Sequence, residues 1–333
     1  MISILLPFQN AESTIQGCLA SIKHQSYRSF EVVAVDDHST DRTRSLIAAW
    51  PDTRIRVISN PGEGIADALN FGIRQARYPL IARMDADDLM RSNRLEVQYQ
   101  LLQSKPDVSL VSSKVTLFPL RMVKQGYLEY IRWQNNLLSH QDIYSHRFVE
   151  SPLAHPSVMF HRESILELGG YHKGDFPEDY ELWLRAMDRG IKVAKHPAVL
   201  LDWRESSNRL SRTHPAYERQ AFDRLRAHYL ARLPVLKQRP VAFWGAGRKT
   251  RQRAHHLIMQ GIEPDVWIDI DPKKIGNCIR GVPVVAPDFL QNRDANNKPF
   301  VLIYVTNHGA RDLIQGELDS FGYQINEDYL SVG

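Results

Sequence analysis

The stretch that decides the fold reads Leu80-Ile81-Ala82-Arg83-Met84-Asp85-Ala86-Asp87-Asp88. Its apolar part, which begins at Tyr78 and ends at Met84, predicts a buried strand, because short continuous apolar runs are typical of strands covered on both faces. An acidic run, Asp85–Asp88, follows directly where that strand ends. Carboxylates in this position predict a functional loop at the carboxyl end of a sheet strand.

Upstream of this junction, apolar runs alternate with segments of helical periodicity. Strands are expected over Ile2–Leu6, Phe30–Val35 and Arg54–Ser59, and helices over Ile15–Ile22, Arg42–Trp50 and Ile65–Gly72. In the first of these helices the apolar residues fall at i, i+3, i+4 and i+7, which is one helix face. Repeated strand–helix units predict an α/β fold with a mostly parallel central sheet and helices on both of its faces.

The order of elements is less regular in the middle of the chain. Helices are expected over Arg94–Gln103, Trp133–Arg147, Tyr180–Arg189 and Pro215–Arg232, with short strands over Val108–Ser112, Val158–Phe160 and Ala198–Trp203. Two prolines and a basic, polar spacer at Leu233–Pro240 then predict a domain boundary. We therefore expect a first domain over residues 1–235 and a second over residues 240–333.

The second domain restarts the strand–turn–helix pattern and is expected to be a small Rossmann-like α/β domain. Strands are predicted at Val241–Trp244, Val266–Asp269 and Phe300–Thr306. The turn from Gly245 to Gly247 is typical of loops that admit a phosphate close to the backbone, and Asp269 lies near the spacing of a ribose-binding acid. Thr250 stands where the third glycine of that pattern belongs. A binding or interaction module is favoured over a redox site, and binding of NAD stays open.

Composition restricts the class of protein. Of the 333 residues, 43% are hydrophobic and 24% are charged, with a formal net charge of +4, which is ordinary for a globular chain and argues against disorder. The basic excess suits phosphate-bearing partners or an anionic membrane surface, although most such charge is solvated. Cys18 and Cys278 lack metal-site spacing. With no membrane-span or signal-peptide pattern, we expect a cytoplasmic protein, with peripheral membrane contact left open.

The Asp85–Asp88 run is the sharpest chemical signal. Hard carboxylate oxygens suit Mg²⁺ or Mn²⁺, which commonly complete their coordination with substrate phosphates. Such a cation neutralises charge on a departing diphosphate. The alternative is an acidic turn or helix cap ahead of Arg91, which the position after a buried strand disfavours.

Two further acidic motifs follow the same logic. In Asp36–Asp41, a carboxylate can accept the imide N–H of a uracil ring, whereas Ser39, Thr40 or Asp41 can instead cap the next helix. In Pro177–Tyr180 the acids lie at a helix start, where one of them can act as a general base. Their alternative role is to complement the helix dipole.

Together these motifs resemble the family 2 glycosyltransferases, which have the GT-A fold. The resemblance covers about residues 1–232 and is carried in order by Ile4–Asn10, Val33–Asp41, Gly64–Ala76 with Asp85–Asp88, and Glu178–Arg185. It implies a nucleotide-sugar-binding domain and an inverting transfer to a hydroxyl of a glycan or lipid-linked acceptor in polysaccharide assembly, with UDP-sugar as the expected donor.

The resemblance also implies a role for each matching residue. The implied nucleotide-binding residues are Pro7, Phe8, Asn10, Glu12, Asp36, Asp37, Asn70, Arg83 and Asp85. Asp87 is implied as the direct ligand of Mn²⁺ or Mg²⁺, with Asp85 beside it and His155 as a further candidate, for which a structural role is the alternative. Asp179 is implied as the catalytic base, supported by Glu178.

Two local features qualify the match. His38 replaces the glycine usual in the base-binding segment, and a left-handed backbone is less comfortable for histidine than for glycine. This leaves open which of Asp36 and Asp37 contacts the base. The stretch Arg204–Arg212, in which serine, asparagine and arginine alternate, is a candidate lid over the diphosphate, and an ordinary solvated loop is the alternative.

Two other function classes compete with a glycosyltransferase. A nucleotidyltransferase shares a related sheet but usually opens with a glycine-rich basic loop, which Pro7–Asn10 does not provide. A non-catalytic sugar-nucleotide sensor would not need the candidate metal and base residues. No nucleic-acid partner is expected, and the oligomeric state stays open.

Overall fold

The computed structural model describes residues 1–206, 209–291, 293–294, 297–307 and 309–333. Within this part, the chain divides into two compact units. The first unit holds residues 1–143 and 151–214, and the second holds residues 144–150 and 215–333. Residues 215–235, which were expected to be in the first domain, therefore group with the second unit.

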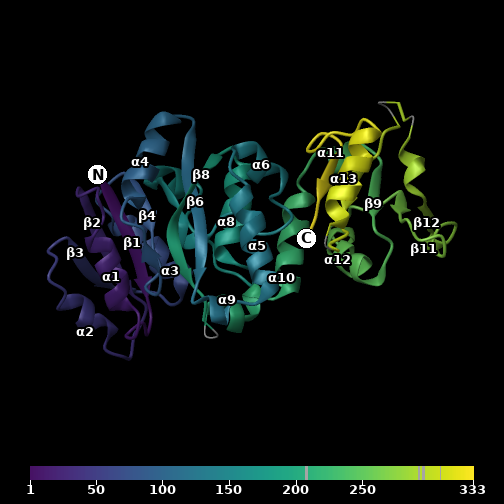
Figure 1. Ribbon diagram of the computed structural model, residues 1–333. Helices are drawn as coiled ribbons and strands as arrows, with labels where there is room; N and C mark the ends of the chain where they lie inside the picture. The colour runs from purple at the N-terminus through teal and green to yellow at the C-terminus, as the bar shows by residue number, and fades with distance from the viewer. Residues whose placement is uncertain (207–208, 292, 295–296, 308) are drawn as a thin grey trace. The chain divides into compact units, whose positions relative to one another are not determined.

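Figure 1 shows the helices and strands of the first unit. In chain order they are β1 (Ile2–Phe8), α1 (Ile15–Lys23), β2 (Phe30–Asp36), α2 (Thr43–Ala48), β3 (Ile55–Ser59), α3 (Ile65–Gln75), β4 (Leu80–Arg83), β5 (Leu89–Met90), α4 (Arg94–Ser104), β6 (Val108–Phe118), η1 (Leu120–Met122), α5 (Gln125–Asn136), η2 (His155–Ser157), β7 (Met159–His161), α7 (Arg162–Glu167), α8 (Glu178–Asp188), β8 (Lys192–Arg204) and α9 (Leu210–Thr213). Helix α6 (His140–Ser145) spans the point where the chain passes into the second unit.

The strands of the first unit form one sheet in the order β3-β2-β1-β4-β7-β6-β8-β5. Strand β1 is parallel to β2 and β4, β2 is parallel to β3, and β6 is parallel to β8. Strand β7 is antiparallel to both of its neighbours, and β5 is antiparallel to β8. The predicted α/β fold with a mostly parallel sheet is confirmed, and the ends of β1, β2 and β4 lie at one edge.

Helices cover both faces of this sheet because alternate strand residues point to opposite sides. Ile4 and Leu6 of β1 join the core cluster that contains Cys18 of α1. On the other face, Leu5 and Val35 reach α3 at Gly72, where the helix approaches the sheet closely. A Cβ added to Gly72 would lie 2.2 Å from Leu5 Cδ1 and 2.9 Å from Val35 Cγ2.

We expect Gly72→Ala to destabilise the fold by about 1–3 kcal/mol, because the added methyl overpacks this contact. Urea unfolding measures the change. The matched control is Gly126→Ala in α5, where a Cβ meets nothing within 4 Å, so stability stays equal or rises by up to ~1 kcal/mol. Equal unfolding midpoints for the two variants would contradict the close-packing account.

The helix expected over Trp133–Arg147 is wrong, because two helices, α5 and α6, occupy this region. Leu137 ends α5 with an extended backbone. Ser139 then accepts a hydrogen bond from Asp142 N through Oγ, while Asp142 accepts one from Ser139 N, each at 3.0 Å. These reciprocal hydrogen bonds cap the start of a new helix. The polar–apolar pattern continues across this point, so the sequence pattern did not indicate the break.

Strands β6 and β8 are much longer than the predicted Val108–Ser112 and Ala198–Trp203. The prediction for β6 stopped at polar residues, yet Ser112 and Ser113 are fully buried inside the strand. The two long strands pair in parallel with register irregularities, which periodicity alone does not reveal.

The second unit contains a separate, mostly parallel sheet. Its elements are η3 (Pro215–Tyr217), α10 (Arg219–Leu230), α11 (Val235–Gln238), β9 (Val241–Trp244), α12 (Arg248–Ile258), β10 (Val266–Ile268), β11 (Cys278–Ile279), β12 (Val282–Val285), η4 (Pro287–Leu290), β13 (Phe300–Ile303), α13 (Ala310–Ser320) and β14 (Tyr329–Ser331). The strand order is β11-β12-β10-β9-β13-β14. Among the described residues of both units, no helix is long and apolar enough to cross a bilayer.

Candidate functional site

Three carboxylates gather where β4 ends. Asp85, Asp87 and Asp88 each offer an oxygen, and these oxygens lie within 4.8 Å of one another. Asp88 is fully buried, and its Oδ1 accepts a hydrogen bond from Arg204 N at 2.7 Å. Its Oδ2 has no hydrogen-bond partner within the described parts of the chain. A buried acceptor without a partner, facing two other acids, is an arrangement that a cation would complete.

The three carboxylates of this cluster repel one another when they are ionised. Burial, followed by the charge of Asp85, raises the pKa of Asp87 to about 6. Burial also raises the pKa of Asp88 well above its usual range, and Asp87 and Asp85 add to this effect. A hard divalent cation relieves such repulsion through oxygen ligands. The residues present therefore fit Mg²⁺ or Mn²⁺, and Asp88 joins the predicted pair as a third candidate ligand.

A buried arginine lies beside the acids. Arg83 is 3% exposed and forms an ion pair with Asp85. Its Nε has no hydrogen-bond partner among the residues that the structure describes. Behind it, the fully buried Arg94 donates from Nη2 to Arg83 O at 2.8 Å. Arg94 was missed by sequence reasoning, because an arginine that opens a helix normally lies in solvent.

The end of β2 distinguishes Asp36 from Asp37. Asp36 accepts hydrogen bonds from Ser39 N and from Arg44 Nη1, each at 3.0 Å, so both of its oxygens are engaged. Asp37 Oδ1 accepts from Asn60 Nδ2 at 2.7 Å and from Gly64 N at 3.1 Å. No hydrogen bond reaches Asp37 Oδ2 from the described residues, so Asp37 retains an acceptor that a ligand can use.

The segment after Asp37 has a left-handed backbone at His38, the residue that stands where the family usually has a glycine. His38 is left-handed, with φ of 58°, and its Nε2 lies 2.7 Å from Gly62 O. This contact holds the ring against the neighbouring loop. Asp41 accepts a hydrogen bond from Thr43 N at 2.9 Å, so Asp41 acts in the local cap of α2.

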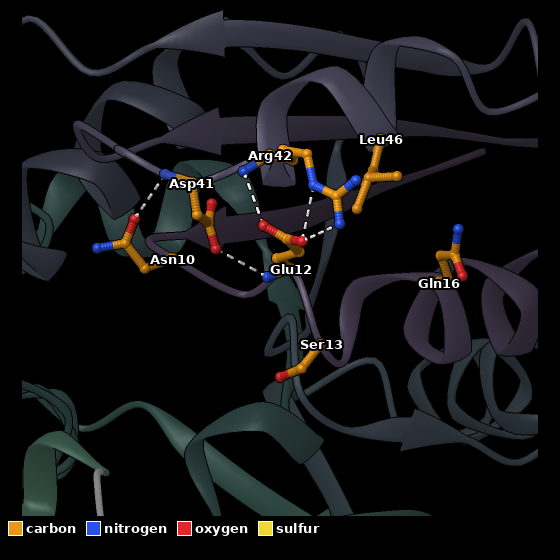
Figure 2. A pocket seen from close by; sticks show the side chains of 7 residues that line it. All are labelled: Asn10, Glu12, Ser13, Gln16, Asp41, Arg42 and Leu46. Atoms are coloured by element: carbon orange, nitrogen blue, oxygen red, sulfur yellow. Dashed lines mark hydrogen bonds and ion pairs between the residues drawn. The ribbon is translucent and has the colours of Figure 1, made fainter.

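The other predicted nucleotide residues of this edge support the loops. Pro7 and Phe8 are buried in β1, and Asn10 Oδ1 accepts from Thr40 N at 2.8 Å. Glu12 pairs with Arg42, whose Nε donates to Oε1 at 2.8 Å. Asn10, Glu12 and Arg42 line a hollow of about 470 Å³, and Figure 2 shows how their side chains lie around it. The hollow is lined by Asn10, Glu12, Ser13, Gln16, Asp41, Arg42 and Leu46.

The third acidic motif opens α8. Glu178 is buried and Asp179 is partly buried. Burial, followed by the charge of Glu178, raises the pKa of Asp179 to about 8. A carboxylate with such a pKa can accept a proton near neutral pH.

His155 lies beside this motif rather than among the three clustered aspartates. Its Nε2 is 2.8 Å from Tyr171 Oη, and its Nδ1 is 3.8 Å from Glu178 Oε1. Burial, followed by the charge of Arg83, lowers the pKa of His155 well below its usual value. His155 therefore contacts the Tyr171 hydroxyl at hydrogen-bond distance, and it lies near the acid that precedes Asp179 at a longer distance.

Tyr171 connects the two acidic motifs electrostatically. Burial raises the pKa of its phenol, Arg83 lowers it, and the charges of Glu178, Asp179 and Asp85 raise it. The loop that carries Tyr171 is held by Asn70 of α3, whose side-chain amide exchanges two hydrogen bonds of 2.8 Å with the Tyr171 backbone. Asn70, predicted to bind nucleotide, thus positions this loop.

Two arginines lie at and after the end of β8. Arg204 donates from Nε to Asp87 O at 2.6 Å. Arg209 stacks its guanidinium 4.5 Å from the Trp203 ring centroid and donates to Tyr127 Oη at 3.1 Å. The candidate lid over 204–212 includes residues 207 and 208, which lie outside the described residues.

In the second unit, side chains of the same unit fill the space beside the Gly245–Gly247 turn. Gly245 is left-handed, and a Cβ there would lie 2.9 Å from both Thr250 Cγ2 and Val305 Cγ2. Asp269 accepts hydrogen bonds from Ala246 N at 2.8 Å, Asp271 N at 2.9 Å and Lys274 Nζ at 3.0 Å. The acid at the predicted ribose position therefore secures the turn itself.

The chain is similar in sequence to known proteins. The model of the family "Glycosyl transferase family 2" matches residues 3–168. The amylovoran biosynthesis glycosyltransferase AmsE of Erwinia amylovora is 29% identical over 64% of this chain and 79% of its own length. The UDP-Gal:α-D-GlcNAc-diphosphoundecaprenol β-1,3-galactosyltransferase of Escherichia coli is 30% identical over 60% of this chain and 71% of its own.

A solved structure supports the fold independently. Residues 1–349 of S. aureus TarS, in complex with UDP-GlcNAc, align with a TM-score of 0.53 at 16% identity, over 69% of this chain and 72% of that one. At this identity the likeness concerns the fold, which is GT-A-like. Taken with the sequence relatives, it shows that the chain is a glycosyltransferase that belongs to glycosyltransferase family 2.

Proposed function

We propose that this glycosyltransferase moves a hexose from a UDP-sugar, with inversion, to a hydroxyl of a GlcNAc residue in a lipid-diphosphate-linked acceptor. The proposed donor and acceptor follow the E. coli relative, whose name specifies UDP-Gal and GlcNAc-diphosphoundecaprenol. The two other function classes, nucleotidyltransferase and sensor, gain no support from the site.

Donor recognition is assigned to the edge where β1, β2 and β4 end. Asp37 Oδ2 accepts the uracil imide N–H, since Asp37 Oδ1 is already engaged by Asn60 and Gly64. Pro7, Phe8, Asn10, Glu12 and Asp36 shape the nucleoside pocket. Arg83 contributes a desolvated cation for the diphosphate, and a buried guanidinium with an unpaired N–H favours such an anion.

Asp85, Asp87 and Asp88 are the proposed holders of Mn²⁺ or Mg²⁺, with Asp87 as the principal ligand. When bound, the cation neutralises charge on the departing nucleoside diphosphate. Arg204 keeps the Asp87–Asp88 turn in place through its bonds to both residues. His155, which contacts Tyr171 and Glu178, is assigned to the acceptor side of the site instead of the metal.

Asp179 is the proposed general base. It takes the proton of the acceptor hydroxyl as that oxygen bonds to the anomeric carbon, and the bond from that carbon to UDP breaks on the opposite face. One displacement of this kind inverts the anomeric configuration. Glu178 supports the base by holding its pKa up, and the His155–Tyr171 pair orders the neighbouring loop.

The observation that carries the proposal is the cluster of Asp85, Asp87 and Asp88 where β4 ends, whose oxygens lie within 4.8 Å of one another and in which the buried Asp88 Oδ2 has no hydrogen-bond partner among the described residues. The test is an assay with a synthetic GlcNAc-diphosphate-lipid acceptor, Mn²⁺ and separate UDP-Gal, UDP-Glc and UDP-GlcNAc donors. The expected result is UDP release that depends on acceptor, with a β-linked product. Pyrophosphate release, or UDP binding without turnover for any donor, would contradict the proposal.

We expect the pH profile of kcat/KM to report Asp179. Because a base must be ionised, the rate should rise about tenfold per pH unit below the base's pKa of about 8 and level off above it. Glu178→Gln removes the neighbouring charge that raises this pKa, so the rise should move to lower pH. Identical profiles for the two proteins would show that another group limits the rate.

A further inference from the structure

Strand β6 leads into an exposed amphipathic loop, here called the 119–124 loop, which contains η1 and ends at Lys124. Leu120 and Met122 are 67% and 48% exposed. The basic residues Arg121 and Lys124 are exposed as well. Elsewhere in the described part of the first unit, large exposed apolar side chains are isolated, at Met1 and Val199. Two neighbouring apolar side chains interleaved with two cations therefore form a local surface.

This loop begins at the edge of the sheet that carries the aspartates. Strand β6 runs parallel to β8, and their last residues, Phe118 and Arg204, pair in register. The guanidinium of Arg204 lies 4.4 Å from the Phe118 ring centroid. Arg204 also donates from Nε to Asp87 O at 2.6 Å. One side chain thus joins the base of the loop to the candidate metal turn.

We infer that the 119–124 loop docks on an anionic lipid surface, with Leu120 and Met122 in the boundary between headgroups and acyl chains and Arg121 and Lys124 on the phosphates. Apolar side chains flanked by cations are the chemistry of interfacial anchors. The inference rests on the proposed function in one respect, which is that a lipid-diphosphate-linked acceptor cannot leave the bilayer. The docked loop places the acidic turn beside that acceptor.

A second copy of the chain fits this surface less well. Stable protein interfaces bury about 800 Å² on each partner and are depleted in lysine. Two apolar side chains with a cation beside each offer far less apolar area than that. The positive charge of the protein also favours anionic over neutral lipids, because the chain carries a formal net charge of +4 and anionic leaflets attract basic segments.

The first test is sedimentation of the full chain with vesicles of phosphatidylethanolamine and phosphatidylglycerol, and with neutral phosphatidylcholine vesicles. Leu120→Ser combined with Met122→Ser should weaken binding at least about tenfold, the effect of withdrawing roughly two methylene groups from the acyl region. Arg121→Gln combined with Lys124→Gln should weaken binding to the anionic vesicles alone, by about fivefold for each charge.

The matched control is Met259→Ser combined with Leu313→Ser, which removes one methionine and one leucine that are 70% and 77% exposed in the second unit. Binding of this variant should equal that of the unmodified chain. Thermal shifts with UDP and Mn²⁺ should be the same for all variants, because the loop does not hold the donor. Loss of turnover in every protein with vesicle binding intact would therefore refute the proposed function and leave the docking surface standing.

A second test reads the position of the loop directly. A polarity-sensitive dye is attached to Leu120→Cys in a Cys278→Ser background, where the remaining Cys18 is buried. Anionic vesicles should shift its emission to the blue and protect it from an aqueous quencher, whereas dye at Leu313→Cys should not respond. The inference is overturned if the unmodified chain ignores anionic vesicles, if the apolar pair is dispensable, or if light scattering shows a dimer that the apolar substitutions dissociate.

Discussion

Asp179→Asn is expected to lower kcat about 10³-fold while leaving UDP binding intact. The substitution keeps the size of the side chain but removes its ability to take a proton, and positioned general bases contribute ~10²–10⁴-fold. Asp179 is partly buried, and its raised pKa of about 8 reflects burial and the Glu178 charge. Initial rates of UDP release with a saturating acceptor give kcat, and calorimetry with UDP and Mn²⁺ gives donor affinity.

The control for this prediction is Asp188→Asn at the other end of the same helix. Asp188 is the last residue of α8 and is exposed, so its substitution should leave kcat within about twofold, as most surface changes away from special features do. Glu178→Gln should fall between the two, because it changes the pKa of the base without removing the base. Retention of a tenth or more of the activity by Asp179→Asn would assign the base to another residue.

Local sequence patterns were sufficient to predict the elements that carry the acids. A buried apolar run followed by carboxylates identified the end of β4, and the apolar face of α8 placed Glu178 and Asp179 at its start. These inferences rely on periodicity and helix-end chemistry, which act over a few residues. The same rules predicted three strands of the second sheet, whereas β11 and β14 were too short to be recognised and Pro283 interrupts the apolar run of β12.

Long-range associations could not be predicted in this way. The contact between His155 and Tyr171 joins residues on either side of β7 and α7, and the antiparallel pairing of β7 with β4 is likewise not indicated by the local pattern. From the sequence, Arg94 is expected to lie in solvent at the start of a helix, whereas in the structure it is buried and contacts Arg83. Likewise, Asp36 and Asp37 are neighbouring aspartates that the sequence does not distinguish, and their different partners, among them Arg44 for Asp36 and Asn60 for Asp37, appear only in the fold.

Asp87→Asn is expected to abolish the metal dependence of donor binding and to lower turnover by ~10²-fold or more, since a bound cation supplies several kcal/mol of charge stabilisation. In thermal-shift measurements, Mn²⁺ should raise the Tm of the UDP-bound unmodified chain, because a ligand that binds only the folded state stabilises it. The variant should show no such increase. Asp107→Asn, which alters an exposed carboxylate paired with Lys192, is the control and should behave like the unmodified chain.

The variant should also be more stable than the unmodified chain when no metal is present. Because the pKa of Asp87 is raised to about 6 in the folded state, its ionised form disfavours folding, and stability is lost as pH rises from the unfolded value near 4 toward 6. Asparagine removes that charge, so the metal-free Tm at pH 8 should increase as the metal response disappears. A purely structural aspartate would lose stability on substitution, so a lower metal-free Tm would reject Asp87 as the ligand.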